Sequence, residues 1–167
     1  MIRKLTPADK DYPGLLRNIY DPPQTLYING SFEDGDAVAV AIVGSRRASP
    51  YGIEMAERFG CDLASRGVTV VSGMAIGIDS AAHRGALMAK GRTIAVMGSG
   101  HGDIYPPQNK KLYEEIAASG AVVTEYEDET APLPYNFPSR NRIISGLSLA
   151  VIVVEAARNS GALITAN

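Results

Sequence analysis

Short apolar runs that alternate with amphipathic stretches constrain the fold of this chain more than any other feature of its sequence. The run 37–43 is almost continuously apolar, as is typical of a parallel strand that is covered on both faces. Ser49 and Pro50 then mark a helix start, and apolar residues recur at helical spacing up to Gly67. The alternation continues with strands expected at 68–71, 93–97, 121–125 and 149–155, and helices expected at 78–90, 108–118 and 140–145.

These elements predict an α/β fold, a Rossmann-like parallel sheet with helices on both faces. Residues 1–35 contain four prolines and only short apolar groups, so we interpret them as a short N-terminal extension with one strand near 25–28. Residues 36–167 are the expected core. We expect the C-terminal part of this core to be missing, because a helix has barely begun where the sequence stops.

Composition narrows the class of protein. With 167 residues, 46% of them hydrophobic, the chain is long enough for one domain with a substantial core. Its net charge of −2 excludes a protein that is basic all over, so any phosphate contact must come from a local group of arginines and amides. The single cysteine, Cys61, fits a reducing compartment, and no run of about 18 apolar residues occurs. We therefore expect a cytoplasmic protein.

The segment after the first core strand has the composition of a phosphate-binding turn. Gly44 allows a sharp turn of the backbone, Ser45 offers a hydroxyl, and Arg46 offers a planar set of donors suited to phosphate oxygens. An ordinary turn with solvated arginines explains the same residues equally well. The position at a strand end favours the functional interpretation, since ligands of parallel α/β sheets bind there.

A second segment of this kind follows the next strand. Gly73 and Gly77 flank a loop that leads into a helix, whose free amides would face an anion. Asp79 either caps this helix or makes a hydrogen bond that shapes the loop or reaches a sugar. Neither the Walker lysine loop nor a strict GxGxxG is present, so the interpretation depends on context.

The segment 137–146 is the strongest candidate for binding phosphates. Ser139 can cap a helix, Arg140 and Arg142 can reach phosphate oxygens, and Asn141 adds an amide between them. The alternative is a helix with a solvated basic edge, because exposed arginine is the norm.

Three further residues have a structural and a functional interpretation each. His83 falls one helical turn after Asp79 and could pair with it, or it could be a structural histidine. His101 lies in a glycine-rich loop that could close over a ligand, or it could be exposed to solvent. Glu155 ends the last strand, where it could hold a ribose hydroxyl or neutralise an arginine. Since no nucleophile, carboxylate pair or zinc cluster is recognisable, we expect a binding protein without enzyme activity, metal or cofactor.

The motifs of this chain occur in the order found in the DprA/Smf family of DNA-processing proteins, which the sequence resembles over nearly its whole length. The motifs are 41–46, 71–79 with 81–83, 93–98, 105–106 with Asn109, 137–146, and 153–156 with Ser160 and Gly161. The resemblance implies a bacterial factor that binds single-stranded DNA and loads the RecA recombinase during natural transformation.

The resemblance also implies a homodimer and a positively charged pocket for DNA. The residues that would line this pocket are Gly44, Ser45, Arg46, Gly73, Gly77, Arg140, Asn141 and Arg142, with Ser160 and Gly161 at the opening of the next helix. Relatives commonly have a basic residue where this chain has Ile76, so one phosphate contact is missing here. They also continue past residue 167 with further strands and helices.

Two alternatives remain open at this point. The first is a nucleotide-hydrolysing enzyme that resembles the phosphoribohydrolases once labelled lysine decarboxylases, which have a related fold. Those enzymes carry a loop with proline and two glycines followed by a glutamate, and residues 160–165 have neither feature. The second is a nucleotide-sensing domain without catalysis, which would bind a mononucleotide at micromolar concentration with no gain from DNA.

Overall fold

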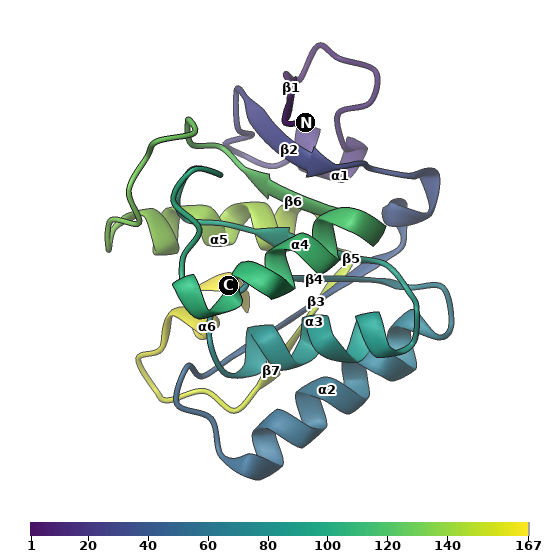
Figure 1. The fold of residues 1–167 in the computed structure, drawn as a ribbon, viewed down its shortest axis with the longest axis vertical. Helices are drawn as coiled ribbons and strands as arrows, with labels where there is room; N and C mark the ends of the chain where they lie inside the picture. The colour runs from purple at the N-terminus through teal and green to yellow at the C-terminus, as the bar shows by residue number, and fades with distance from the viewer. Residues whose placement is uncertain (167) are drawn as a thin grey trace.

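In the computed structural model, which describes residues 1–166, the chain forms one seven-stranded sheet between two layers of helices (Figure 1). The strands are β1 (Arg3–Leu5), β2 (Leu26–Gly30), β3 (Ala39–Gly44), β4 (Thr69–Ser72), β5 (Thr93–Val96), β6 (Ala121–Thr124) and β7 (Ala150–Val154). The helices are α1 (Gly14–Arg17), α2 (Pro50–Ala64), α3 (Ile78–Met88), α4 (Lys110–Ser119), α5 (Asn136–Gly146) and α6 (Gly161–Ala166). Short 3-10 helices occupy Asp34–Ala37 and Pro107–Asn109. The strand order is β1-β2-β6-β5-β4-β3-β7.

The apolar runs form strands because their alternate side chains enter two different cores. In β5, Ile94 and Val96 face the layer that contains α1 and α5, whereas Ala95 faces the layer that contains α3 and α4. Helix α2 packs with α3 on this second side. A strand that is covered on both faces needs apolar side chains at nearly every position, which explains why the runs are continuous.

The predicted parallel core is confirmed. Strands β6, β5, β4, β3 and β7 pair in parallel, in that order. The N-terminal extension makes the sheet mixed, because β2 pairs antiparallel with β6 and β1 pairs antiparallel with β2. Strand β1 is not predicted from the sequence, since it has three residues and only Leu5 is buried, so no alternation can be read from it.

Helix α2 starts as predicted, whereas helix α5 does not. The Ser49 hydroxyl accepts a hydrogen bond from the Gly52 N–H at 3.1 Å and caps α2, as predicted. Helix α5 begins at Asn136, earlier than the predicted Arg140, and contains Pro138 in its first turn. First-turn amides have no acceptor within a helix, so proline is tolerated there. The prediction that Ser139 caps this helix is wrong, since its hydroxyl donates to the Tyr135 carbonyl at 3.1 Å from inside the helix.

Helices α2 and α3 approach each other at glycines. A Cβ on Gly60 would lie 2.3 Å from the Ala82 carbonyl oxygen, and one on Gly85 would lie 2.0 Å from the Glu57 carbonyl oxygen. Only glycine fits at either place. Within residues 1–166, no helix combines the length and the apolar character needed to cross a bilayer.

Candidate functional site

A cavity of about 450 Å³ lies at the carboxyl ends of the central parallel strands. It collects residues that are far apart in sequence, from the loops after β3, β4 and β7 and from α5 and α6. The predicted site residues that line it are Gly44, Ser45, Arg46, Asp79, Arg140, Asn141, Ser160 and Gly161. The structure therefore brings together most of the residues that sequence reasoning selected.

Close backbone packing holds the loops after β3 and β4 together. A Cβ on Gly44 would lie 1.9 Å from the Val154 carbonyl oxygen, so glycine is required where β3 ends beside β7. Gly77 has a φ of +86°, and a Cβ there would lie 2.4 Å from the Ser45 carbonyl oxygen. The Ile78 N–H donates to the same Ser45 oxygen at 3.2 Å. Gly77 does not line the cavity; it allows the contact that fixes the cavity wall.

Asp79 shapes the loop after β4 through hydrogen bonds to its backbone. Gly77, not Asp79, is the residue before α3, so the interpretation of Asp79 as the helix cap is wrong. Its carboxylate accepts hydrogen bonds from the N–H groups of Gly73 (3.2 Å) and Ala75 (3.4 Å), which confirms the loop-shaping alternative. The side chain is buried, and this burial raises its pKa, while the Arg140 charge opposes the rise. Two amides of this loop are therefore occupied by a carboxylate of the protein itself.

Arg140 is a buried arginine at the centre of the site, with 4% of its surface exposed. Its guanidinium donates to the carbonyl oxygens of Gly73 and Val96, and its Nε donates to Asn141 Oδ1 at 3.1 Å. Burial lowers its pKa to about 10, and the Asp79 charge opposes this shift. Arg140 therefore keeps its charge at neutral pH while most of its donors are directed to the protein.

Both cationic side chains that line the cavity approach the same aromatic ring, that of Phe137. Arg46 is 5.1 Å from the ring centre of Phe137 and Arg140 is 5.5 Å from it, both within the range of cation–π contacts. Tyr105 packs against Phe137 with the ring centres 5.7 Å apart. Arg46 is exposed and makes no ion pair with any other residue in 1–166, so its guanidinium is available to a ligand.

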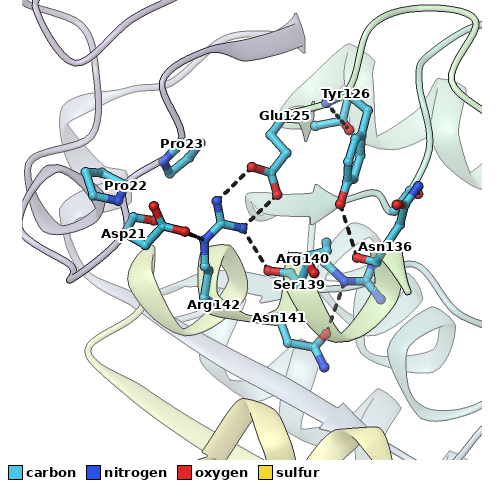
Figure 2. A network of polar contacts seen from close by, with 12 residues as sticks. Asp21, Pro22, Pro23, Glu125, Tyr126, Asn136, Ser139, Arg140, Asn141 and Arg142 are labelled. Carbon is cyan, nitrogen blue, oxygen red and sulfur yellow. Dashed lines mark hydrogen bonds and ion pairs between the residues drawn. The ribbon is translucent and has the colours of Figure 1, made fainter. Parts of the chain in front are cut away.

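The expectation that Arg142 lines the same pocket is wrong. Figure 2 shows its guanidinium turned toward Glu125, at 2.7 Å from both carboxylate oxygens, and toward Asp21, whose carboxylate lies at 3.2 Å. These contacts raise the pKa of Arg142, with the hydrogen bond to Glu125 as the main cause. Arg142 therefore joins α5 to the end of β6 and to the N-terminal extension, and it does not face the cavity.

Three other expected contributors also lie elsewhere. His83 is fully buried and bonds Thr93 Oγ1 at 2.6 Å, not Asp79; this confirms the structural interpretation. Burial, and to a lesser degree the Arg84 charge, lower its pKa to about 3. Glu155 neither neutralises an arginine nor lines the cavity, since its carboxylate bonds the backbone N–H and hydroxyl of Ser49 at the start of α2.

His101 neither lines the cavity nor is exposed to solvent. It is buried, and its ring bonds the Tyr113 hydroxyl at 2.8 Å and the Tyr27 carbonyl at 3.0 Å. Gly73 lies just outside the main cavity, in the wall of a smaller neighbouring hollow. A Cβ on Gly73 would lie 2.7 Å from Asp79 and 3.0 Å from Arg140, so glycine lets these two charges approach the loop.

Some residues that complete the site are not among the predicted site residues. Pro132 and Pro134 supply part of the cavity wall from the loop between β6 and α5. Asn109 supports the loop after β4, since its amide donates to the Met74 carbonyl at 2.7 Å and to Ser80 Oγ at 2.8 Å. Only the motif order pointed to Asn109, and no local pattern identifies the two prolines.

The chain matches one protein family over almost its whole length. The model of the family described as DNA recombination-mediator protein A matches residues 3–167. Protein Smf of Synechocystis sp. is 49% identical over 166 residues, which cover 97% of this chain and 42% of that protein. The X-ray structure of DNA processing protein A from Streptococcus pneumoniae has a TM-score of 0.93 at 42% identity and covers 98% of this chain and 58% of its own.

A second solved relative is DNA processing protein A from Helicobacter pylori, which is described for its single-stranded DNA binding mode. It has a TM-score of 0.87 at 32% identity, over 99% of this chain and 74% of its own. The chain spans about half the length of the curated relatives it matches. Since the family model extends over nearly all of this sequence and its relatives have the same fold, the chain belongs to the DNA recombination-mediator protein A family, the family of the DprA and Smf proteins.

Proposed function

We propose that this chain binds single-stranded DNA in the cavity at the carboxyl ends of its parallel strands. The observation that carries the proposal is the exposed Arg46, which has no ion pair within residues 1–166 and stands over the face of Phe137 at the cavity. A nucleotide offers one group for each of these side chains. Its phosphate suits the guanidinium, and its base suits the aromatic faces of Phe137 and Tyr105.

The remaining cavity residues have separate parts in this proposal. Gly44 and Ser45 let the strand approach the backbone, and Arg140 contributes positive potential from a buried position. Asn141 donates its amide to the Gly161 carbonyl at 3.1 Å, which ties α5 to the opening of α6. Ser160 lines the same opening, and its hydroxyl is buried without a partner in residues 1–166, so it is a candidate donor to the ligand. Gly73 and Gly77 shape the adjoining loop.

The relatives support this choice of ligand. The H. pylori protein, which has the same fold, is described as binding single-stranded DNA. We propose that the whole protein loads RecA onto the bound strand as a homodimer in the cytoplasm, and that it does so by binding rather than by catalysis. These roles are assigned to the whole protein, since the chain spans about half of its curated relatives.

The test compares two neighbouring arginines. Arg46 lines the cavity, whereas Arg47 is also exposed and does not, so Arg47→Ala is the matched control for Arg46→Ala. Binding of a labelled oligothymidylate is measured by fluorescence anisotropy over a series of salt concentrations. Each lost phosphate contact should lower the slope of log K against log salt by about 0.7. We expect this change, with weaker binding, for Arg46→Ala only.

Two other results of this binding assay would contradict the proposal. Equal losses in the two variants would indicate a diffuse electrostatic attraction and would contradict the assignment of the cavity. A mononucleotide that binds as tightly as the oligonucleotide would favour the nucleotide-binding alternative. Both variants are expected to unfold at the parent urea midpoint, because neither side chain contributes to the core.

A further inference from the structure

A second, smaller hollow of about 230 Å³ adjoins the main cavity, and we call it the side hollow. It lies between the loop after β4 and the segment that precedes α4. Ile76, Pro107 and Gln108 line the side hollow and not the main cavity. Arg46, Ala75, Tyr105 and Phe137 line both.

The shared wall determines how a ligand could use both spaces. It contains the ring of Phe137, the ring of Tyr105 and the guanidinium of Arg46, which stands over Phe137. A phosphate held by Arg46 would therefore lie at the boundary between the two spaces. In a single strand, the groups on either side of one phosphate are two successive nucleosides.

The chemistry of the side hollow suits a base and not a second phosphate. Ile76 is 45% exposed, although it is a large apolar side chain, and Pro107 adds a second apolar surface. Among its lining residues, Arg46 has the only side chain that is charged at neutral pH. Gln108 adds an exposed amide that can both donate to and accept from the edge of a base.

We propose that the side hollow takes the base of the neighbouring nucleotide, so that the site holds two successive nucleotides of one strand with Arg46 at the phosphate between them. This inference rests on the proposed function and adds the number of nucleotides and the residues of the second subsite. The exposed Ile76 then has a role, which is to cover one face of that base.

The test combines changes in the protein with changes in the ligand. Ile76→Ser removes apolar contact from the side hollow without adding a charge, and Met88→Ser is the matched control, since Met88 is 66% exposed at the other end of α3. Four unlabelled ligands compete with labelled oligothymidylate: thymidine monophosphate, the 5′-phosphorylated dinucleotide, and two versions of this dinucleotide that lack one base or the other.

We expect Ile76→Ser to weaken the binding of the complete dinucleotide by about three- to tenfold, as the loss of a few methylene contacts predicts. Thymidine monophosphate should be unaffected. One of the two abasic dinucleotides should bind the parent and Ile76→Ser equally, because the base that Ile76 covers is absent. Met88→Ser should behave as the parent with every ligand.

Two results would overturn the inference in different ways. If the complete dinucleotide competes equally well for binding to Ile76→Ser and to the parent, the side hollow takes no base, while binding through Arg46 still stands. If the parent binds neither the labelled strand nor the dinucleotide, the proposed function itself fails. An equal loss with both abasic ligands would mean that Ile76 acts by a general change of the loop, and would also reject the subsite.

Discussion

Replacing Arg140 by methionine should destabilise the fold by about 3–5 kcal/mol, because it leaves a buried charge without its partner. Arg140 and Asp79 are 4% and 6% exposed, and the guanidinium also satisfies the carbonyl oxygens of Gly73 and Val96. A domain of this size is stable by about 5–15 kcal/mol in total, so the loss is a large fraction of the whole. Urea unfolding followed by circular dichroism measures it.

A second substitution separates charge from packing. Asp79→Asn keeps an oxygen that can accept from the N–H groups of Gly73 and Ala75 but removes the negative charge. We expect the double variant Asp79→Asn with Arg140→Met to be more stable than Arg140→Met alone by about 2 kcal/mol, within the range of coupling between contacting residues.

The pH dependence gives an independent test of the same pair. Burial raises the pKa of Asp79 above 3.8, so the folded protein holds this proton to a higher pH than the unfolded chain. The contribution of Asp79 to stability is therefore present below pH 3.8 and is lost as the pH rises through its folded-state pKa. Arg140→Met removes the charge that opposes this shift, so the penalty of the substitution should shrink as the pH is lowered. A penalty that is the same at every pH, or no gain from Asp79→Asn, would refute the reasoning.

Three further substitutions, one of them with a matched control, test the fold. Gly85→Ala should cost about 1–3 kcal/mol, because its Cβ would lie 2.0 Å from the Glu57 carbonyl, whereas Gly14→Ala, with open space around it, should stay within about 0.5 kcal/mol in the same urea assay. Burial lowers the pKa of His83 to about 3, so stability that is present above 6.5 should be lost as the pH falls from 6.5 toward 3, and His83→Leu should flatten this part of the stability curve. Arg142→Met should cost about 1 kcal/mol, less than Arg140→Met, because its ion pairs are partly exposed; an equal loss would contradict the different roles assigned to the two arginines.

Much of the core fold could be predicted because each buried strand carries its own evidence. A strand such as β4 is buried at every position, and its four consecutive apolar or small residues indicate this burial without reference to distant parts of the sequence. The start of α5 could not be placed in the same way. Proline is accepted at several positions of a first turn, so Pro138 indicates a helix start without giving its first residue.

The site residues were predicted where the backbone determines them and missed where distant contacts do. The carboxyl ends of parallel strands meet at one edge, which is why Arg46 and Asp79 come together. His101 was misjudged because its partners, Tyr27 and Tyr113, are remote in sequence. Arg142 does not share the cavity with Arg140, since residues two apart on a helix point in different directions and Arg140 faces the cavity.

The three arginines around the site differ in what neutralises them, and under the proposed function this difference determines which of them can bind a phosphate. Glu125 and Asp21 pair with Arg142, and the buried Asp79 offsets Arg140. Arg46 alone among the three stays unpaired within residues 1–166. A site with one available cation gains little from charge, so much of its affinity has to come from the aromatic wall beside that cation. Under the proposed function, a chain with a net charge of −2 would therefore bind DNA mainly through the surfaces next to Phe137, including the side hollow.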